Sequence, residues 1–293
     1  IRDVAVTGVQ TCALPIFVDP ATQARIAALG NPKDTLAWLR ELASGLARTG
    51  GAQAQYVAGS LVLGTDIIFE PGNSGDTVFY WVQAGWIFAV SLVGTLAWST
   101  ASKRVEYDTL HKWFRLFVRF ALASQMFFFG MAKVIPTQFV PPALTSLVTP
   151  LGNFPLSNLL WLFIGASTPY QIATGVAEMA AGVFLVFAKT TPLGAAIALF
   201  DMLQVLLLNT FYDFGLKMIS FHYVLMALVL LAPDARRLAN VLVLDRPAPP
   251  SAVPPLFASD RANRIAVIAQ AVFAIYLIAL FTQVNVRSEE HTS

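Results

Sequence analysis

Four apolar stretches of the chain each carry a polar or ionisable side chain near the middle, and these residue types could support chemistry. They are Gln125 in Leu116–Ile135, Glu178 in Pro169–Ala188, Asp201 in Pro192–Phe211 and His222 in Gly215–Ala232. Each stretch is about 20 residues long, which is enough to cross a bilayer as a helix. Ionisable groups are costly in hydrocarbon and usually face the interior of a helical bundle. The sequence therefore predicts a polar cluster at the midplane of an all-α, polytopic transmembrane helical bundle.

The two acidic residues of this cluster are expected to interact. Only Lys189–Thr191 separates their stretches, so the two helices should be antiparallel neighbours with Glu178 and Asp201 at similar depth. Two ionised carboxylates would repel each other strongly in a low-dielectric site, so we expect the pair to hold at least one proton. His222 on the next helix and Gln125 on the preceding one are expected to complete the network.

Two glycines indicate how closely the helices approach. Gly175 and Gly182 lie three residues before and four residues after Glu178, on the same helical face. Small residues at this spacing allow another backbone to come near, so we predict a helix-packing role for both glycines.

Several interpretations of the cluster stay open. The four residues could be polar contacts that fix helix register, a site for a ligand or proton, or individual groups that face headgroups or water. Glu178, Asp201 and His222 are suitable metal ligands by type, but no spacing such as Glu-x-x-His supports a metal centre, and we expect none. Lys133, near the end of its stretch, is expected to extend towards the interface. No catalytic motif is recognisable.

Composition and charge support a membrane protein. Apolar residues make up 56% of the chain and charged residues 12%, against about 25% charged in soluble domains. Two further spans are expected at Thr77–Thr100 and Ile265–Thr282, whereas Leu156–Ser167 is too short to cross and is interpreted as re-entrant. Lysines and arginines, among them Arg236 and Arg237, gather on one side, which predicts the cytoplasmic face of a bacterial inner membrane. The net charge of +2 gives no reason to expect nucleic acid as a partner.

Both ends of the chain resemble translated sequencing adapter. Residues 1–16 read IRDVAVTGVQTCALPI and residues 287–293 read RSEEHTS. On this interpretation the source insert is 17–286, truncated at both ends. The one cysteine, Cys12, falls in the adapter, so disulfide, iron–sulfur and thiol-exchange chemistry are not expected.

The remaining residues divide by composition. We expect a truncated extracytoplasmic region at 17–76, a flanking transmembrane helix at 77–100, a membrane domain at 115–247, a proline-rich cytoplasmic linker at 248–264 and a truncated C-terminal transmembrane helix at 265–286.

Residues 115–247 resemble the DoxX family of bacterial membrane proteins. The resemblance rests on three segments in order: RLFVRFALASQMFFFGMAKVIPTQF, YQIATGVAEMAAGVFLVFAKTTPLGA and NTFYDFGLKMISFHYVLMALVLLAPDARRLANVLVLDRP. The second contains the Gly175-x-x-Glu178-x-x-x-Gly182 pattern, where the family has its glycine–glutamate helix. The resemblance implies a four-helix membrane core plus flanking transmembrane helices, but it assigns no catalytic residue.

The family takes its name from a subunit of a thiosulfate:quinone oxidoreductase, so the resemblance implies a subunit or accessory of a quinone-linked membrane redox system. The partners would be the lipid bilayer and membrane redox subunits, with quinone as a ligand and no covalently bound cofactor. Two alternatives stay open: a proton-coupled small-molecule permease, and a structural membrane scaffold without a ligand. Whether the protein is an enzyme is left open.

Overall fold

The computed structural model describes residues 75–102, 106–248 and 254–290, and the described residues form helices joined by turns. The interpretations of residues 1–16 and of most of 17–76 lie outside these residues. The chain divides into two units, residues 1–105 and residues 106–293, and each is described by itself. In the first unit, helix α4 spans Val78–Ala101 and matches the predicted span.

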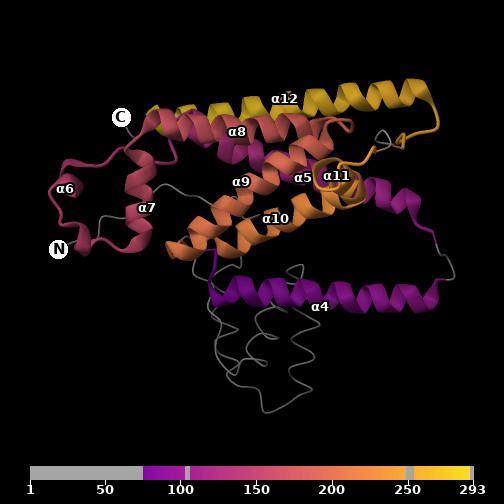
Figure 1. Cartoon of the computed structure of the whole chain (residues 1–293), viewed down its shortest axis with the longest axis horizontal. Helices are drawn as coiled ribbons and strands as arrows, with labels where there is room; N and C mark the ends of the chain where they lie inside the picture. The colour runs from indigo at the N-terminus through magenta and orange to yellow at the C-terminus, as the bar shows by residue number, and fades with distance from the viewer. Residues whose placement is uncertain (1–74, 103–105, 249–253, 291–293) are drawn as a thin grey trace, which may run out of the picture. The chain divides into compact units, whose positions relative to one another are not determined.

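The second unit contains all the other helices (Figure 1). The long ones are α5 (Asp108–Val134), α8 (Thr168–Val186), α9 (Thr191–Phe211), α10 (Lys217–Leu231) and α12 (Asp260–Glu290). The short ones are α6 (Leu144–Leu147), α7 (Leu156–Gly165) and α11 (Ala235–Leu242). Helix α12 is longer than the predicted span at both ends, and it continues into residues 287–290, which were interpreted as adapter.

Five helical segments are long and apolar enough to cross a membrane: α4, α5, α9, the continuous Lys217–Leu242 segment and α12. The predicted class, an all-α polytopic membrane protein, is therefore confirmed. Helix α8 is not among the five, although its 19 residues extend over about 28 Å at 1.5 Å per residue. Its polar and small residues, such as Gln171 and Glu178, lower its hydropathy. Helix α7 has only 10 residues, too few to cross, as predicted.

The directions of the helices follow from residue pairs that touch across them. Helix α8 packs against both α5 and α9, α9 packs against α10, and α12 runs along α5 (Figure 1). Helices α5 and α12 are parallel, because the Phe120 and Phe128 rings contact Phe273 and Phe281 in the same order. Helices α5, α9 and α12 therefore begin at one end of the unit, where α8 and α10 finish. We call it the basic end, because it carries Lys189 between α8 and α9, Arg236 in α11 and Arg264 in the first turns of α12.

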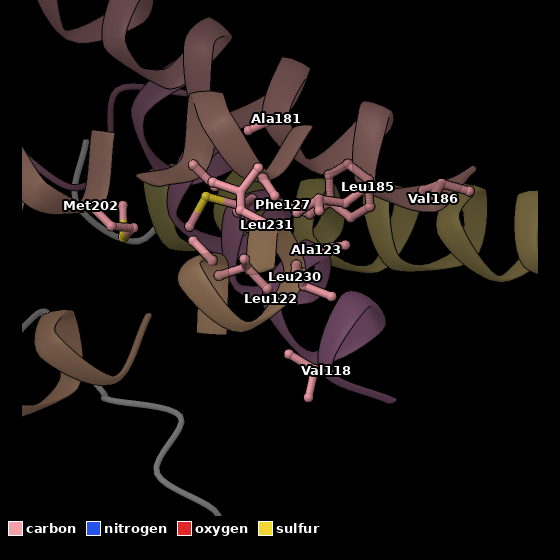
Figure 2. Close-up of a cluster of buried hydrophobic side chains, with 14 of the residues drawn as sticks. Val118, Leu122, Ala123, Phe127, Ala181, Leu185, Val186, Met202, Leu230 and Leu231 are labelled. Atoms are coloured by element: carbon pink, nitrogen blue, oxygen red, sulfur yellow. The ribbon is translucent and has the colours of Figure 1, made fainter. Parts of the chain in front are cut away.

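The core of the second unit forms where α5, α8, α9 and α10 meet. Leu122 and Phe127 of α5, Leu185 of α8 and Leu230 of α10 are at most 1% exposed, and Figure 2 shows them clustered between the helices. Lipid tails are as apolar as leucine, so in a membrane such a cluster stabilises the fold mainly through close packing.

Glycines set the closest approach between α5 and α8. A Cβ added to Gly175 would lie 2.7 Å from the carbonyl oxygen of Gly130, and one added to Gly182 would lie 2.6 Å from the Phe127 ring. Both distances are shorter than a carbon contact allows, so neither position has room for a side chain. The two glycines selected for helix packing thus lie directly against α5, and Gly130 is the reciprocal small residue on that helix.

Candidate functional site

An ion pair lies buried between α5 and α8. The Lys133 ammonium pairs with Oε1 of Glu178, and the two side chains are only 10% and 1% exposed. The expectation that Lys133 extends to the interface is therefore wrong. The reason lies in Gly175, because a Cβ added there would be 2.7 Å from the Lys133 Cβ. The missing side chain leaves room for the lysine stem, which reaches Glu178 one turn along α8.

A second carboxyl group joins this pair from α9. Asp201 lies within hydrogen-bonding reach of Glu178 and also interacts with the Lys133 charge. Oε2 of Glu178 and Oδ2 of Asp201 are both inaccessible and lack a hydrogen-bond donor. Two carboxylate oxygens cannot bond to each other without a proton, whereas one shared proton would provide a donor for this contact. We call Lys133, Glu178 and Asp201 the triad.

The charges of the triad favour the same conclusion. Two carboxylates and one ammonium carry a net charge of −1, and a single added proton makes the group neutral. An uncompensated charge in a buried site is strongly unfavourable. One added proton would therefore remove the unfavourable charge from this site.

The structure does not bring the other two predicted site residues into the triad. His222 is exposed, and its Nδ1 bonds to the Met218 carbonyl at 2.7 Å on the same helix. His222 follows buried Ser220 by two residues. Two residues correspond to a rotation of about 200° around the helix axis, so the His222 side chain faces away from the core. Gln125 instead accepts a hydrogen bond from the Tyr223 hydroxyl at 2.8 Å, linking α5 to α10.

An aromatic cluster lies at the end of the unit opposite the basic end. The Trp161 ring lies 4.4 Å from the Phe139 ring and is stacked on Phe214 at 4.7 Å, centroid to centroid. We call these three residues the aromatic cap. Gln171 fastens it to α8: in the orientation that satisfies its amide, it donates to the Phe139 carbonyl and accepts from the Phe139 N–H, both at 3.1 Å. Gln171 is seven residues before Glu178, or about 10 Å along the helix axis.

Metal ligation is not indicated in the described part of the chain. No group of three or more histidine, cysteine, aspartate or glutamate side chains there is arranged to hold a metal ion. In the triad, Lys133 occupies the position that a cation would take beside Glu178.

One comparison with known proteins identifies a relative. The chain is 32% identical over 130 residues to a Bacillus subtilis protein described as "Uncharacterized protein YwoB". The aligned residues cover 44% of this chain and 79% of the relative. The chain belongs to the YwoB family. No family model matches it, and no solved structure matches it significantly. The description of YwoB names no activity, so the function has to be argued from the site.

Sequence reasoning missed one residue of the triad in this YwoB-family chain. Lys133 was assigned to the interface because it lies at the end of its stretch. The overlooked signal was charge balance, because ionised side chains inside a membrane pair with one another. The stretch Leu116–Ile135 contains two basic residues, Arg119 near its start and Lys133 near its end.

Proposed function

We propose that this YwoB-family chain is a DoxX-like inner-membrane protein that acts as a subunit or accessory of a quinone-linked redox system. On this proposal α5, α8, α9 and α10 are the four-helix core, and the triad is the group that exchanges protons. The observation that carries the proposal is the buried Lys133–Glu178 ion pair with a second carboxyl group beside it, that of Asp201, whose Oδ2 is inaccessible.

Quinone chemistry needs such a group. Reduction of a quinone consumes two electrons and two protons, and the electrons would come from a partner subunit with its own cofactor. In an apolar environment each proton has to be delivered by a positioned acid. The carboxyl that holds the extra proton of the triad would donate it to a quinone oxygen, regain a proton from water and donate that one to supply the second.

The surroundings of the triad are suited to a lipophilic ring. The Lys133 ammonium lies 6.0 Å from the centroid of the Phe129 ring, and the neighbouring Tyr223 ring is 6.2 Å from Phe129. Aromatic faces stack with quinone-like rings, and an ammonium has three N–H donors, so Lys133 could also donate to a carbonyl oxygen. The resemblance to the DoxX family supports the same ligand class.

Extraction of the purified protein tests the proposal. We expect quinone to copurify with the chain in mild detergent, and Glu178→Gln to remain folded while it loses quinone-dependent proton uptake. His222→Gln is the matched control, because this polar residue of similar depth is exposed on α10 and outside the triad. If the protein contains no quinone, binds none when it is added, and has no redox partner, the proposal is refuted.

A second candidate function is a proton-coupled small-molecule permease. It is favoured by the unpartnered oxygens of Glu178 and Asp201, because a proton site of this kind needs no redox partner. Proteoliposomes with an imposed pH gradient separate the two functions. A permease gives a proton flux across the membrane that Glu178→Gln abolishes. A redox site that exchanges protons with one side of the membrane gives no such flux. A structural scaffold would give neither flux nor bound quinone.

A further inference from the structure

Two arginines near the basic end of α5 are bound only to neutral groups. Arg115 and Arg119 are one turn apart, about 6 Å along the helix axis. Nη2 of Arg119 donates to the Gln270 side chain of α12 at 2.5 Å, and Nη2 of Arg115 donates to the Leu230 carbonyl of α10 at 3.3 Å. The pair therefore lies where α5 meets α10 and α12.

This arginine pair has no counter-ion among the described residues. Ion pairs there join Lys133 to Glu178, Lys217 to Asp213 and Arg237 to Asp234, and none includes either arginine. Arg119 is only 7% exposed, and its Nε is inaccessible and without an acceptor. A guanidinium has five N–H donors, and each arginine uses one in the hydrogen bonds above. Two positive charges with unused donors therefore lie together.

The position of the pair places it at headgroup depth. The Trp113 ring contacts the Phe257 ring with centroids 6.0 Å apart, and tryptophans of this kind gather at membrane interfaces. Arg115 and Arg119 follow Trp113 by two and six residues, which is about 3 and 9 Å deeper along α5. Lys189, Arg236 and Arg264 also lie at this end. An anion that reaches the pair would thus come from the interface.

We propose that Arg115 and Arg119 bind the phosphate group of an anionic phospholipid between α5, α10 and α12. Guanidinium groups match phosphate oxygens in pairs, and their charge-assisted hydrogen bonds are among the strongest in proteins. Basic sites between transmembrane helices on the cytoplasmic side are suited to such headgroups. The phosphate would supply acceptors for the unused N–H donors and cancel a charge that the protein leaves uncompensated. The inference is independent of the redox proposal, because it does not involve the triad.

Binding of defined lipids to the full chain tests this site. Delipidated protein in a neutral detergent is titrated with phosphatidylglycerol or with phosphatidylcholine of the same acyl chains, and bound lipid is counted by native mass spectrometry. Both lipids carry a phosphate, but the choline ammonium of phosphatidylcholine neutralises it and would be repelled by the two arginines. We therefore expect phosphatidylglycerol, whose phosphate charge is uncompensated, to bind at least about tenfold more tightly. Arg119→Gln should remove this preference, and Arg264→Gln, which changes an exposed arginine at the same end, should keep it.

Three outcomes would overturn the proposal. They are equal binding of the two lipids, a preference that survives Arg119→Gln, and full competition by inorganic phosphate alone, which would assign the site to a soluble anion. If Arg119→Gln fails to fold, Arg119→Lys replaces it, because it keeps the charge but loses the paired geometry. The preference should then fall several-fold, and an unchanged preference would equally refute a phosphate held by the guanidinium.

Discussion

Replacing Lys133 by methionine should destabilise the protein more than any other change in the triad. The substitution keeps most of the stem but leaves Glu178, which is 1% exposed, next to Asp201 without a cation. Removing one partner of a buried ion pair typically costs about 3–5 kcal/mol. We expect a value near 3 kcal/mol, the lower end of this range, because the two carboxyl groups can take up protons and become neutral.

Removing the acid instead should have a smaller effect. After Glu178→Leu, Lys133 still has Asp201 as a partner, because these two charges already interact in the native protein. We therefore expect a loss of about 1–3 kcal/mol, typical for a broken buried hydrogen bond. The double variant replaces the pair by apolar side chains, which is often neutral or stabilising. Its loss should be smaller than that of Lys133→Met alone, giving a coupling energy of about 2–3 kcal/mol.

Unfolding in mixed micelles by added sodium dodecyl sulfate, followed by far-ultraviolet circular dichroism, measures these differences. Lys217→Met is the matched control, because that lysine pairs with an Asp213 side chain that is 83% exposed, and exposed pairs of this kind contribute at most about 1 kcal/mol. If Lys133→Met changes stability no more than this control, or if the two single effects simply add in the double variant, Lys133 and Glu178 are not coupled as described.

Three further predictions concern packing, topology and the aromatic cap. Gly175→Ala should destabilise by about 1–3 kcal/mol in the same unfolding assay, because overpacking displaces a backbone, whereas Gly94→Ala, with nothing within 4 Å, should not destabilise. Cysteine labelling in cells on a cysteine-free background should modify position 237 (Arg237) from the cytoplasm and position 153 (Asn153) from outside, and the reverse would contradict the charge-based topology. Trp161→Ala should lower stability by about 1–3 kcal/mol, since two ring contacts are lost, and should speed hydrogen exchange of the Phe139 amide; unchanged exchange would show that the cap does not hold this segment.

Much of the fold could be predicted from the sequence because membrane-spanning segments have a simple physical signature. Continuous apolar runs identified α4, α5, α9, α10 and α12, and the length of Leu156–Ser167 correctly excluded a further span. The short Lys189–Thr191 connection also predicted the contact between α8 and α9, and with it the approach of Glu178 to Asp201. Local length and composition determine these features.

The rest of the site depends on how each helix is rotated, which the position of a residue along its span does not determine. His222 has the depth of the other polar residues but faces away from them, since Ser220 and Val224 face the core. Lys133 lies near the end of its own helix, yet Gly175 of α8 lies directly beside it, so Glu178, one turn along α8, is within reach of the lysine. Prediction of the triad would have required charge balance and glycine contacts to be considered together.

The two charged places of the second unit are separated by apolar packing, and this bears on the choice between functions. Lys133 follows Arg119 by 14 residues along α5, which corresponds to about 21 Å. Fully buried Leu122 and Phe127 lie between them, and the Gln125 side chain there is bonded to Tyr223. Along α5, no acidic, basic or histidine side chain lies between Arg119 and Lys133. A permease would have to pass a proton across this apolar packing, whereas a quinone site needs to exchange protons on one side only. The packing of α5 therefore favours the redox proposal over the permease.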